Sequence, residues 1–417
     1  MFDLDNWQEI FATIKKNKLR TFLTCFGVFW GIFMLVIMLG SGNGLRNGVL
    51  SDFEGSATNS FFVWAQRTGK PYKGMQPGRN FNYNNEDYKA LMQIPELAVV
   101  SPMNQLGRYQ GKVNAVRGLI STSAGVSGVY PVLNHIESIK IKNGRWLNNN
   151  DIKEKRKIAV IGNHIRNVLF KKEENPIGDY IQVSGVYFKV IGVTEPTGSG
   201  EQAEEQGQSV YLPFSTFQQA FNYGDVVGWF SITSKPNVKA SVAEEKVLSI
   251  LKERHKIAPD DEQAIGHWNM EKQFDKMNGL FNGIDILVWV VGIGTLIAGI
   301  IGVSNIMLII VKERTREIGV KRALGATPMS IVTQLIVESV FLTAIAGYIG
   351  LVISVGLLEL ISSAIPNDGN SMFRSPGVDL NIALVALSIL IVAGALAGLI
   401  PAKKAISISP VEALRTE

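Results

Sequence analysis

The sequence predicts an α-helical membrane protein with four transmembrane helices and a large α+β extracytoplasmic domain inserted between helices 1 and 2. Three observations predict this fold class: four long apolar stretches, a mixed strand-and-helix segment between the first two, and basic residues on one side of the spans. Of the 417 residues, 46% are hydrophobic and 18% are charged, and the mean hydropathy is +0.15. That balance is too apolar for an ordinary soluble enzyme and too polar for membrane spans alone.

The apolar stretches divide the chain into successive segments. Each stretch exceeds the roughly 20 residues that a helix needs to cross the hydrocarbon core. The first is too long for a signal peptide and lacks a small-residue cleavage site, so it is predicted to be an uncleaved anchor. The predicted segments are an amphipathic interfacial helix (1–20), the first span (21–45), an external domain with helical stalk segments at both ends (46–280), the second span (284–311), a coupling helix (312–326), the third span (327–358), a short external loop (359–380), the fourth span (381–401) and a tail (402–417).

Basic residues indicate the orientation of the spans. The loop between the third and fourth spans carries only Arg374 among three acidic residues. By the positive-inside rule, both termini and the segment 312–326 lie in the cytoplasm, and the external domain lies on the other side of the membrane. The basic residues on the cytoplasmic side are Lys15, Lys16, Lys18, Arg20, Lys312, Arg314, Arg316, Lys321, Arg322, Lys403 and Lys404.

The segment before the first span has one apolar helical face, and lysines follow it directly. This pattern predicts a helix lying on the lipid surface of the inner leaflet, and a short helix packed on protein is the alternative. The residues of the apolar face recur at helical spacing: Trp7, Ile10, Phe11 and Ile14.

Small residues recur one turn apart in all four spans. They allow helix backbones to approach closely, which is how membrane helices associate, so a packed bundle is expected. They are Gly27, Gly31, Gly294, Ala298, Gly302, Ala346, Gly350, Gly394 and Gly398.

The external domain has a mixed pattern and is long enough for one large or two small domains. Its predicted strands are SFFVWAQ, KIAVIG, YIQVSGVYFKVIGVT and SVYLPF, and the third contains a hairpin turn at Ser184 and Gly185. The predicted helices are NEDYKALMQI and VKASVAEEKVLSILKERHKI. We expect the Gly-, Gln- and Glu-rich PTGSGEQAEEQGQ to be an exposed loop.

Catalytic and metal-binding motifs are missing from the sequence. It contains no H-E-x-x-H, G-x-S-x-G or C-x-x-C, and no P-loop of the form G-x-x-x-x-G-K-[ST]. The single Cys25 excludes a disulfide within the chain, and the net charge of +5 forms no basic stripe for nucleic acid. We therefore expect a non-catalytic subunit without cofactor or metal, with any ATP hydrolysis in a partner chain. The four histidines, predicted to be surface or satisfied residues, are His135, His164, His255 and His267.

The segment ERTREIGVKRALGA, from Glu313 to Ala326, is densely charged and lies between two apolar spans. Gly325 is placed to end a helix in the left-handed conformation, and Thr327 followed by Pro328 is typical of the next helix start. The segment is thus predicted to be a short helix of its own.

Two ion pairs are predicted within this helix, Glu317 with Lys321 and Glu313 with Arg316. Each contributes only about 0.2–0.5 kcal/mol, too little to explain so many charges as helix support. A solvated loop that sets topology needs no interleaved acids. The pattern favours a docking surface for a cytoplasmic partner over such a loop.

The same segment carries a family resemblance. ERTREIGVKRALGATPMSIVTQLIVESVFLTAIAGYIG resembles the signature region of the FtsX-like permease family of ABC transporters, and PAKKAISISPVEALRTE resembles that family's C-terminal ending. KKNKLRTFLTCFGVFWGIFMLV resembles its first-span entry. NGRWLNNNDIKEKRKIAVIG, NPIGDYIQVSGVYFKVIGVTEP and GQSVYLPFSTF are similar to the MacB-type periplasmic core domain. Larger members of that type fuse the ATPase to the same chain, whereas this sequence starts directly at the permease.

The resemblance implies a mechanotransmission permease that relays ATP-driven motion to its periplasmic domain. The implied partners are a dimeric cytoplasmic ABC ATPase, a second copy or a related permease, the lipid bilayer, and a periplasmic adaptor with an outer-membrane channel. By match of position, the implied ATPase-coupling residues are Glu313, Arg314, Arg316, Glu317, Ile318, Gly319, Lys321, Arg322, Ala323, Gly325, Ala326, Pro410, Glu412 and Ala413.

Several functions stay open within this class and outside it. Efflux of periplasmic peptides or antibiotics is the leading expectation, and lipoprotein release is a variant. An FtsX-like regulator of a cell-wall hydrolase usually has a smaller external domain, and a membrane-anchored enzyme or receptor lacks support in the motifs. Glu338, a charge inside the third span, is interpreted as a structural or interface residue rather than a proton relay.

Overall fold

We describe a computed structural model of the chain, which covers residues 18–51, 57–107, 111–197, 200–365, 373–374, 376–377 and 380–407. The chain forms two compact units. One, the helical unit, comprises residues up to Gly48 and most of those from Leu280 onward, and the other, the α+β domain, runs from Val49 to Gly279. Each unit is described by itself.

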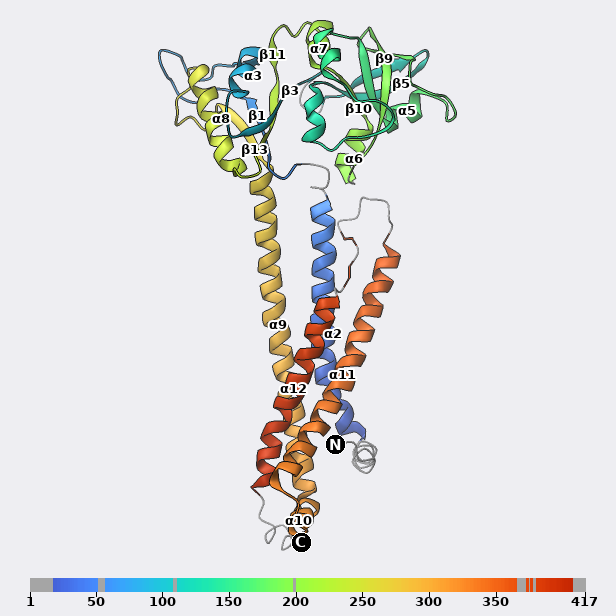
Figure 1. Cartoon of the computed structure of the whole chain (residues 1–417), viewed down its shortest axis with the longest axis vertical. Helices are drawn as coiled ribbons and strands as arrows, with labels where there is room; N and C mark the ends of the chain where they lie inside the picture. The colour runs from blue at the N-terminus through green and yellow to red at the C-terminus, as the bar shows by residue number, and fades with distance from the viewer. Residues whose placement is uncertain are drawn as a thin grey trace. The chain divides into compact units, whose positions relative to one another are not determined.

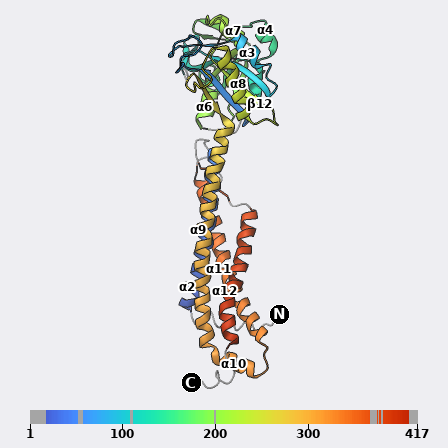
Figure 2. The ribbon, with the colours of Figure 1, turned by 90° about the vertical axis from the view of Figure 1, so that its left-hand side faces the viewer.

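In the part of the chain that the structure describes, four helices are long and apolar enough to cross a membrane (Figure 1). They are α2 (Lys18–Ser51), α9 (Met270–Glu313), α11 (Pro328–Ala364) and α12 (Leu380–Ile406), and the short α10 (Thr315–Ala323) separates α9 from α11. The predicted fold class is therefore confirmed. Figure 2 shows α9 as one uninterrupted helix, and its 44 residues make it about 66 Å long.

Close approach of helix backbones holds the helical unit together. A Cβ added to Gly350 would lie 2.8 Å from the Phe29 carbonyl oxygen, so α2 and α11 touch there. α11 and α12 lie side by side (Figure 1), and the Ser339 hydroxyl donates to the Gly394 carbonyl at 2.8 Å. Glycine at these positions lets the helices approach closely enough to form such contacts.

The small residues of α9 differ from one another in their surroundings. Gly299 faces the backbone of Gly27, with 3.2 Å from its added Cβ to the Gly27 oxygen. Gly294 and Gly302, which were predicted to pack, have open space within 4 Å among the described residues. The α9 face that packs inside the unit is therefore not the face that carries Gly294 and Gly302.

The α+β domain contains an 11-stranded sheet and a two-stranded sheet. Its strands are β1 (Ser60–Ala65), β2 (Tyr83–Asn84), β3 (Leu97–Gln105), β4 (Val113–Arg117), β5 (Ile120–Val129), β6 (Lys140–Gly144), β7 (Ile158–Gly162), β8 (Tyr180–Val183), β9 (Val186–Glu195), β10 (Ser209–Pro213), β11 (Val226–Val227), β12 (Trp229–Ser234) and β13 (Ile265–Asn269). Its helices are α3 (Asn85–Leu91), η1 (Pro131–His135), α4 (Asn149–Lys153), α5 (Asn163–Leu169), α6 (Gly200–Gly207), α7 (Phe214–Ala220) and α8 (Ala240–Arg254).

The large sheet runs in the order β10-β7-β9-β8-β4-β5-β3-β12-β1-β13, with β6 added to β9. Its pairs are antiparallel except β7–β9 and β10–β5. Figure 1 shows two lobes, one with β1, β13 and α8 and one with β5, β9 and α5. Each lobe has an apolar core, and a third core includes Met103, Val129 and Tyr211. Phe230 is fully buried in the first core and Phe217 in the second.

The predicted strands and helices of this domain are confirmed. Ser184 and Gly185 form the β8–β9 turn with φ of 46° and 86°, which matches a two-residue hairpin of type I′. Helix α3 begins with a capping box, in which the Asn84 side chain accepts from Asp87 N–H and the Asp87 side chain accepts from Asn84 N–H.

One local prediction was wrong. The segment expected to be an exposed loop contains helix α6, and the Gln206 side chain is buried. Its amide oxygen accepts from the backbone N–H and the hydroxyl of Thr197, at 2.9 and 3.2 Å. The glycines of this segment suggested a loop, whereas its Glu, Gln and Ala residues are good helix formers.

Candidate coupling site between the second and third spans

Helix α10 is bounded by local signals at both ends. α9 continues to Glu313, so that residue belongs to the end of the span, and Arg314 is the N-cap of α10. Gly325 has a φ of 100°, and Ala326 N–H donates to the Lys321 carbonyl at 3.0 Å, which closes a Schellman motif. The Thr327 side chain then accepts from Ser330 N–H and starts α11, as predicted.

One face of α10 points into the helical unit. Ile318 is 7% exposed, and Gly319 is also buried. Arg314 extends its Nη1 to within 3.6 Å of Glu338 Oε2 on α11. These three members of the predicted coupling set therefore contact the protein itself.

The other face of α10 is open and combines charge with apolar surface. Arg316 and Glu317 are exposed, and Glu317 lies 3.5 Å from Lys321, as predicted. The apolar part was not among the predicted coupling residues: Val320 is 41% exposed and Leu324 is 84% exposed. We call the residues Arg316, Val320 and Leu324, together with the exposed Met329 at the start of α11, the open face.

Helix α10 is also attached to α12. The Arg322 guanidinium donates to the carbonyl of Ile406, the last residue of α12, at 2.9 Å. Arg314 and Arg322 thus tie the two ends of this nine-residue helix to different spans. Both ends of α10 are therefore attached to other helices of the helical unit.

Glu338 lies within α11 and is 2% exposed. A charge inside a span costs roughly 2.5–3.5 kcal/mol on insertion scales, which explains why it faces the unit and an arginine rather than lipid. The neighbouring Ser339 is buried as well and bonds to α12.

Seven residues of the predicted sites lie outside the described part of the chain. Three belong to the coupling set and four to the interfacial helix. They are Pro410, Glu412, Ala413, Trp7, Ile10, Phe11 and Ile14.

The beginning of α9 is held in the α+β domain by a buried carboxylate. Glu244 of α8 is 1% exposed and accepts from Lys272 Nζ at 2.7 Å and Asn269 Nδ2 at 3.0 Å. His267 Nδ1 lies 2.7 Å from its second oxygen. Burial alone raises the pKa of Glu244, but these hydrogen bonds outweigh it and lower the pKa. We call Glu244, His267, Asn269 and Lys272 the anchor cluster.

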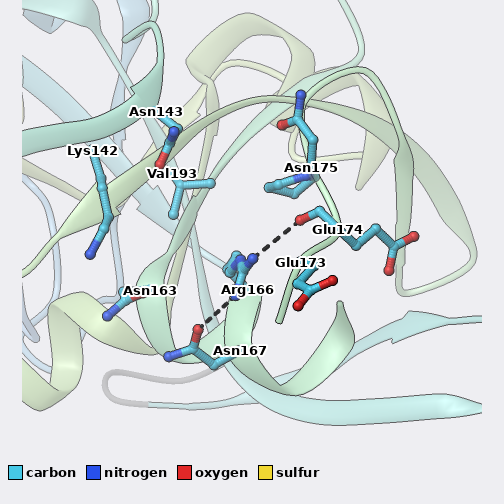
Figure 3. A pocket seen from close by; sticks show the side chains of 10 residues that line it. Lys142, Asn143, Asn163, Arg166, Asn167, Glu173, Glu174, Asn175 and Val193 are labelled. Carbon is cyan, nitrogen blue, oxygen red and sulfur yellow. Dashed lines mark hydrogen bonds between the residues drawn. The ribbon is translucent and has the colours of Figure 1, made fainter. Parts of the chain in front are cut away.

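A cavity of about 360 Å³ lies on the second lobe, between α5, β6, β9 and the segment before β8 (Figure 3). Arg166 Nη2 donates to the Lys172 and Glu174 carbonyls at 2.6 and 3.2 Å, so the guanidinium holds that segment in place. The lining offers hydrogen bonds to a polar ligand and also includes the apolar side chains of Pro176 and Val193. Its lining residues are Lys142, Asn143, Asn163, Arg166, Asn167, Glu173, Glu174, Asn175, Pro176 and Val193.

Metal-binding groups are missing from the part of the chain that the structure covers: no three His, Cys, Asp or Glu side chains there could hold an ion together. His255 lies 2.8 Å from the buried Asp87, and His267 belongs to the anchor cluster. His135 and His164 are exposed.

Four spans, an inserted α+β domain and a short helix between the second and third spans define an FtsX-like ABC permease. A model of the MacB-like periplasmic core domain matches residues 21–250, and a model of the FtsX-like permease C-terminal region matches residues 289–410. The chain belongs to the family of permeases that carry the MacB-like periplasmic core domain.

Relatives named macrolide export ATP-binding/permease protein MacB match almost the whole chain. That of Psychrobacter arcticus is 27% identical over 99% of this chain, and that of Rhodospirillum rubrum is 29% identical over 97%. The chain spans 59% of the length of each. A crystal structure of the periplasmic region of MacB from Actinobacillus actinomycetemcomitans is 20% identical, covers 55% of this chain and 97% of its own, and has a TM-score of 0.43.

Proposed function

We propose that this chain is the permease subunit of an ABC transporter that transmits ATP-driven motion from a separate cytoplasmic ATPase to a periplasmic domain. The open face of α10 carries the proposal. Leu324, at the end of a helix that is tied to two spans, is 84% exposed, and Met329, at the start of α11, is 71% exposed. Exposed apolar residues beside charges are typical of a protein interface.

The energy source is proposed to be another chain. The sequence contains no P-loop, whereas the names of the relatives from Psychrobacter arcticus and Rhodospirillum rubrum include ATP binding. Basic residues such as Lys312 and Lys403 favour a cytoplasmic position for α10 in a bacterial inner membrane. An ATPase dimer could then reach the open face.

The test is binding of the full chain, in lipid nanodiscs, to a purified candidate ATPase. Leu324→Asp is expected to weaken binding about tenfold or more, because it places a charge in the centre of the interface. Leu119→Asp is the matched control: Leu119 is also fully exposed, but it lies in the α+β domain, and its binding should stay within about twofold. If the wild type binds no ATPase, the proposal is wrong. Unchanged binding by Leu324→Asp would reject the open face alone.

We propose a second copy of the chain, or a related permease, as the other partner. Gly294 and Ala298 are exposed on α9, and Asn305 lies on the same helical face. Among the described residues the Asn305 side-chain amide has no hydrogen-bond partner. A small-residue face with an amide suits helix pairing in lipid. In a Cys25→Ser background, Ala298→Cys should form a cross-linked dimer, and its absence would argue against this face.

The proposed activity is efflux of periplasmic compounds such as peptides or antibiotics, through an adaptor and an outer-membrane channel. The relatives' name specifies macrolide export. Expression of the chain with its ATPase in a macrolide-sensitive strain should therefore raise resistance, and Leu324→Asp should abolish the gain. Lipoprotein release and control of a cell-wall hydrolase are the alternative outcomes. Each has its own assay, namely release of lipoprotein from spheroplasts and hydrolysis of peptidoglycan.

A further inference from the structure

Arg314 occupies the joint between α9 and α10. Its backbone N–H donates to the Ile310 carbonyl at 2.9 Å, which completes the last turn of α9. Its own carbonyl accepts from Ile318 N–H at 2.9 Å, which begins α10. Any change in the angle between the two helices must therefore move Arg314.

The side chain of Arg314 connects this joint to the interior of α11. Glu338 lies ten residues beyond Pro328, about 15 Å along the helix axis. The ion pair joins the two side chains at 3.6 Å. Ile331 and Leu335, on the same face of α11 as Glu338, are buried. A charge in such surroundings strongly favours keeping its counter-charge, so the two side chains should move together.

The packing around this pair leaves some room. A cavity of about 20 Å³ lies between α9, α10 and α11, and its lining includes Arg314, Ile318 and Gln334. That volume suffices for about one water molecule. The guanidinium can consequently shift by a small distance without displacing the apolar side chains beside it.

The two attachments of α10 differ in kind. Arg322 binds a backbone carbonyl of α12, a contact that any change of charge on α12 leaves intact. Arg314 pairs with the side chain of Glu338, so this contact with α11 involves a charge that a substitution can remove. A substitution at Glu338 can therefore remove the attachment of α10 to α11 while leaving its attachment to α12 in place.

We propose that Arg314 and Glu338 are positioning residues that deliver the displacement of α10 to α11. The inference rests on the proposed function, since α10 must first receive the force from the ATPase. The pair acts through α10 and α11 and takes no part in docking itself. In this proposal Arg314, a member of the predicted coupling set, acts through Glu338.

The experiment uses the full chain with its ATPase in nanodiscs. In a Cys25→Ser background, Asp275→Cys on the exposed side of α9 carries an environment-sensitive fluorophore that reports ATP-driven motion. Glu338→Gln and Arg314→Gln are expected to bind the ATPase within about threefold of the parent affinity. Their ATP-driven signal should fall about fivefold or more. Glu359→Gln, an exposed carboxylate on the same helix, is the matched control and should keep the signal.

Restoration of the charge pair separates positioning from mere stability. The exchanged variant R314E/E338R should regain about half of the signal or more, because the pair is re-formed in reverse. If it does not accumulate, Arg314→Lys, which keeps the charge, should retain a similar share. A purely structural pair would lower the yield of Glu338→Gln but leave the signal per complex unchanged, and that result would overturn the inference. Lack of binding or signal in the parent protein would instead overturn the proposed function, and this inference with it.

Discussion

The two ends of α9 each meet a buried carboxylate, but in different ways. At its beginning, Glu244 is held by donors at 2.7 and 3.0 Å and by His267 at 2.7 Å. At its end, Arg314 reaches Glu338 over 3.6 Å, next to a small cavity.

The difference shows which end is fixed and which is adjustable. A buried carboxylate whose hydrogen bonds are all short and well directed is rigid, because every displacement lengthens several bonds at once. A longer ion pair between two helices loses less when it shifts. We call the anchor cluster, with its several short hydrogen bonds, the root of α9, and the Arg314 joint, with its longer ion pair, the hinge.

The largest effect on this difference between the two ends of α9 is expected when the anchor cluster, the root, loses its carboxylate. Glu244→Ala is expected to destabilise the beginning of α9 by about 2–3 kcal/mol, because Asn269 loses its acceptor in a buried site. This loss of stability is smaller than for a fully buried charge cluster, because Lys272 and His267 are half-exposed and can hydrogen-bond to water instead. Hydrogen exchange of peptides from α8 and the start of α9 should speed up. Glu245→Ala, an exposed neighbour, should change stability by less than about 0.5 kcal/mol.

A smaller effect on the anchor cluster is expected from lowering the pH, which protonates Glu244. Because the folded pKa of Glu244 is lowered, its contribution to stability is complete above the pKa of an ordinary Glu, about 4.3. That contribution is lost as the pH falls through the folded value. The melting temperature of the wild type should therefore drop more steeply from pH 5 to pH 3 than that of Glu244→Gln. If the melting temperatures of the two proteins fell in parallel with pH, the stability of the anchor cluster would not depend on the ionisation of Glu244.

At the hinge, the C-cap of α10 is the next test. Gly325 has a φ of 100°, where a side chain costs about 1–2 kcal/mol. Gly325→Ala should loosen the last turn of α10 and speed hydrogen exchange of residues 320–327 only. Gly283→Ala, a glycine in α9 whose added Cβ meets open space, is the control. Equal effects of the two substitutions would contradict a special role for the cap.

The smallest effect is expected from the surface pair of α10. Glu317 and Lys321 are separated by 3.5 Å, and their side chains are 49% and 36% exposed. Lys321→Ala should change stability by less than about 0.5 kcal/mol, and salt near 1 M should remove the difference. A larger, salt-independent loss would mean that the open side of α10 is as rigid as the root.

Much of the fold followed from local patterns. The four spans follow from long uncharged stretches, and the limits of α10 followed from Gly325 and from Thr327 before Pro328, each acting on its nearest neighbours. The hairpin at Ser184 and Gly185 was predictable for the same reason.

Local patterns could not predict which residues of the segment 312–326 face the helical unit and which form the open face. Arg314 and Glu338 are 24 residues apart, and their pairing depends on how α10 folds back against α11. The open face did leave a signal, because Val320 and Leu324 are one turn apart among charges. Read as a short amphipathic pattern, that spacing would have pointed to an apolar docking surface. For the α+β domain, the sheet order depends on contacts between distant strands, which no local pattern specifies.

The position of β1 has a consequence for biogenesis. β1 is the first strand of the large sheet to be synthesised, but it lies between β12 and β13, the last two. Phe61 of β1 pairs with Ile232 and with Asn269, so neither neighbour exists until nearly the whole domain has left the ribosome. Until then β1 is an unpaired apolar strand, SFFVWA, of the kind that aggregates. The sheet is therefore completed only when β13, which directly precedes α9, has been synthesised.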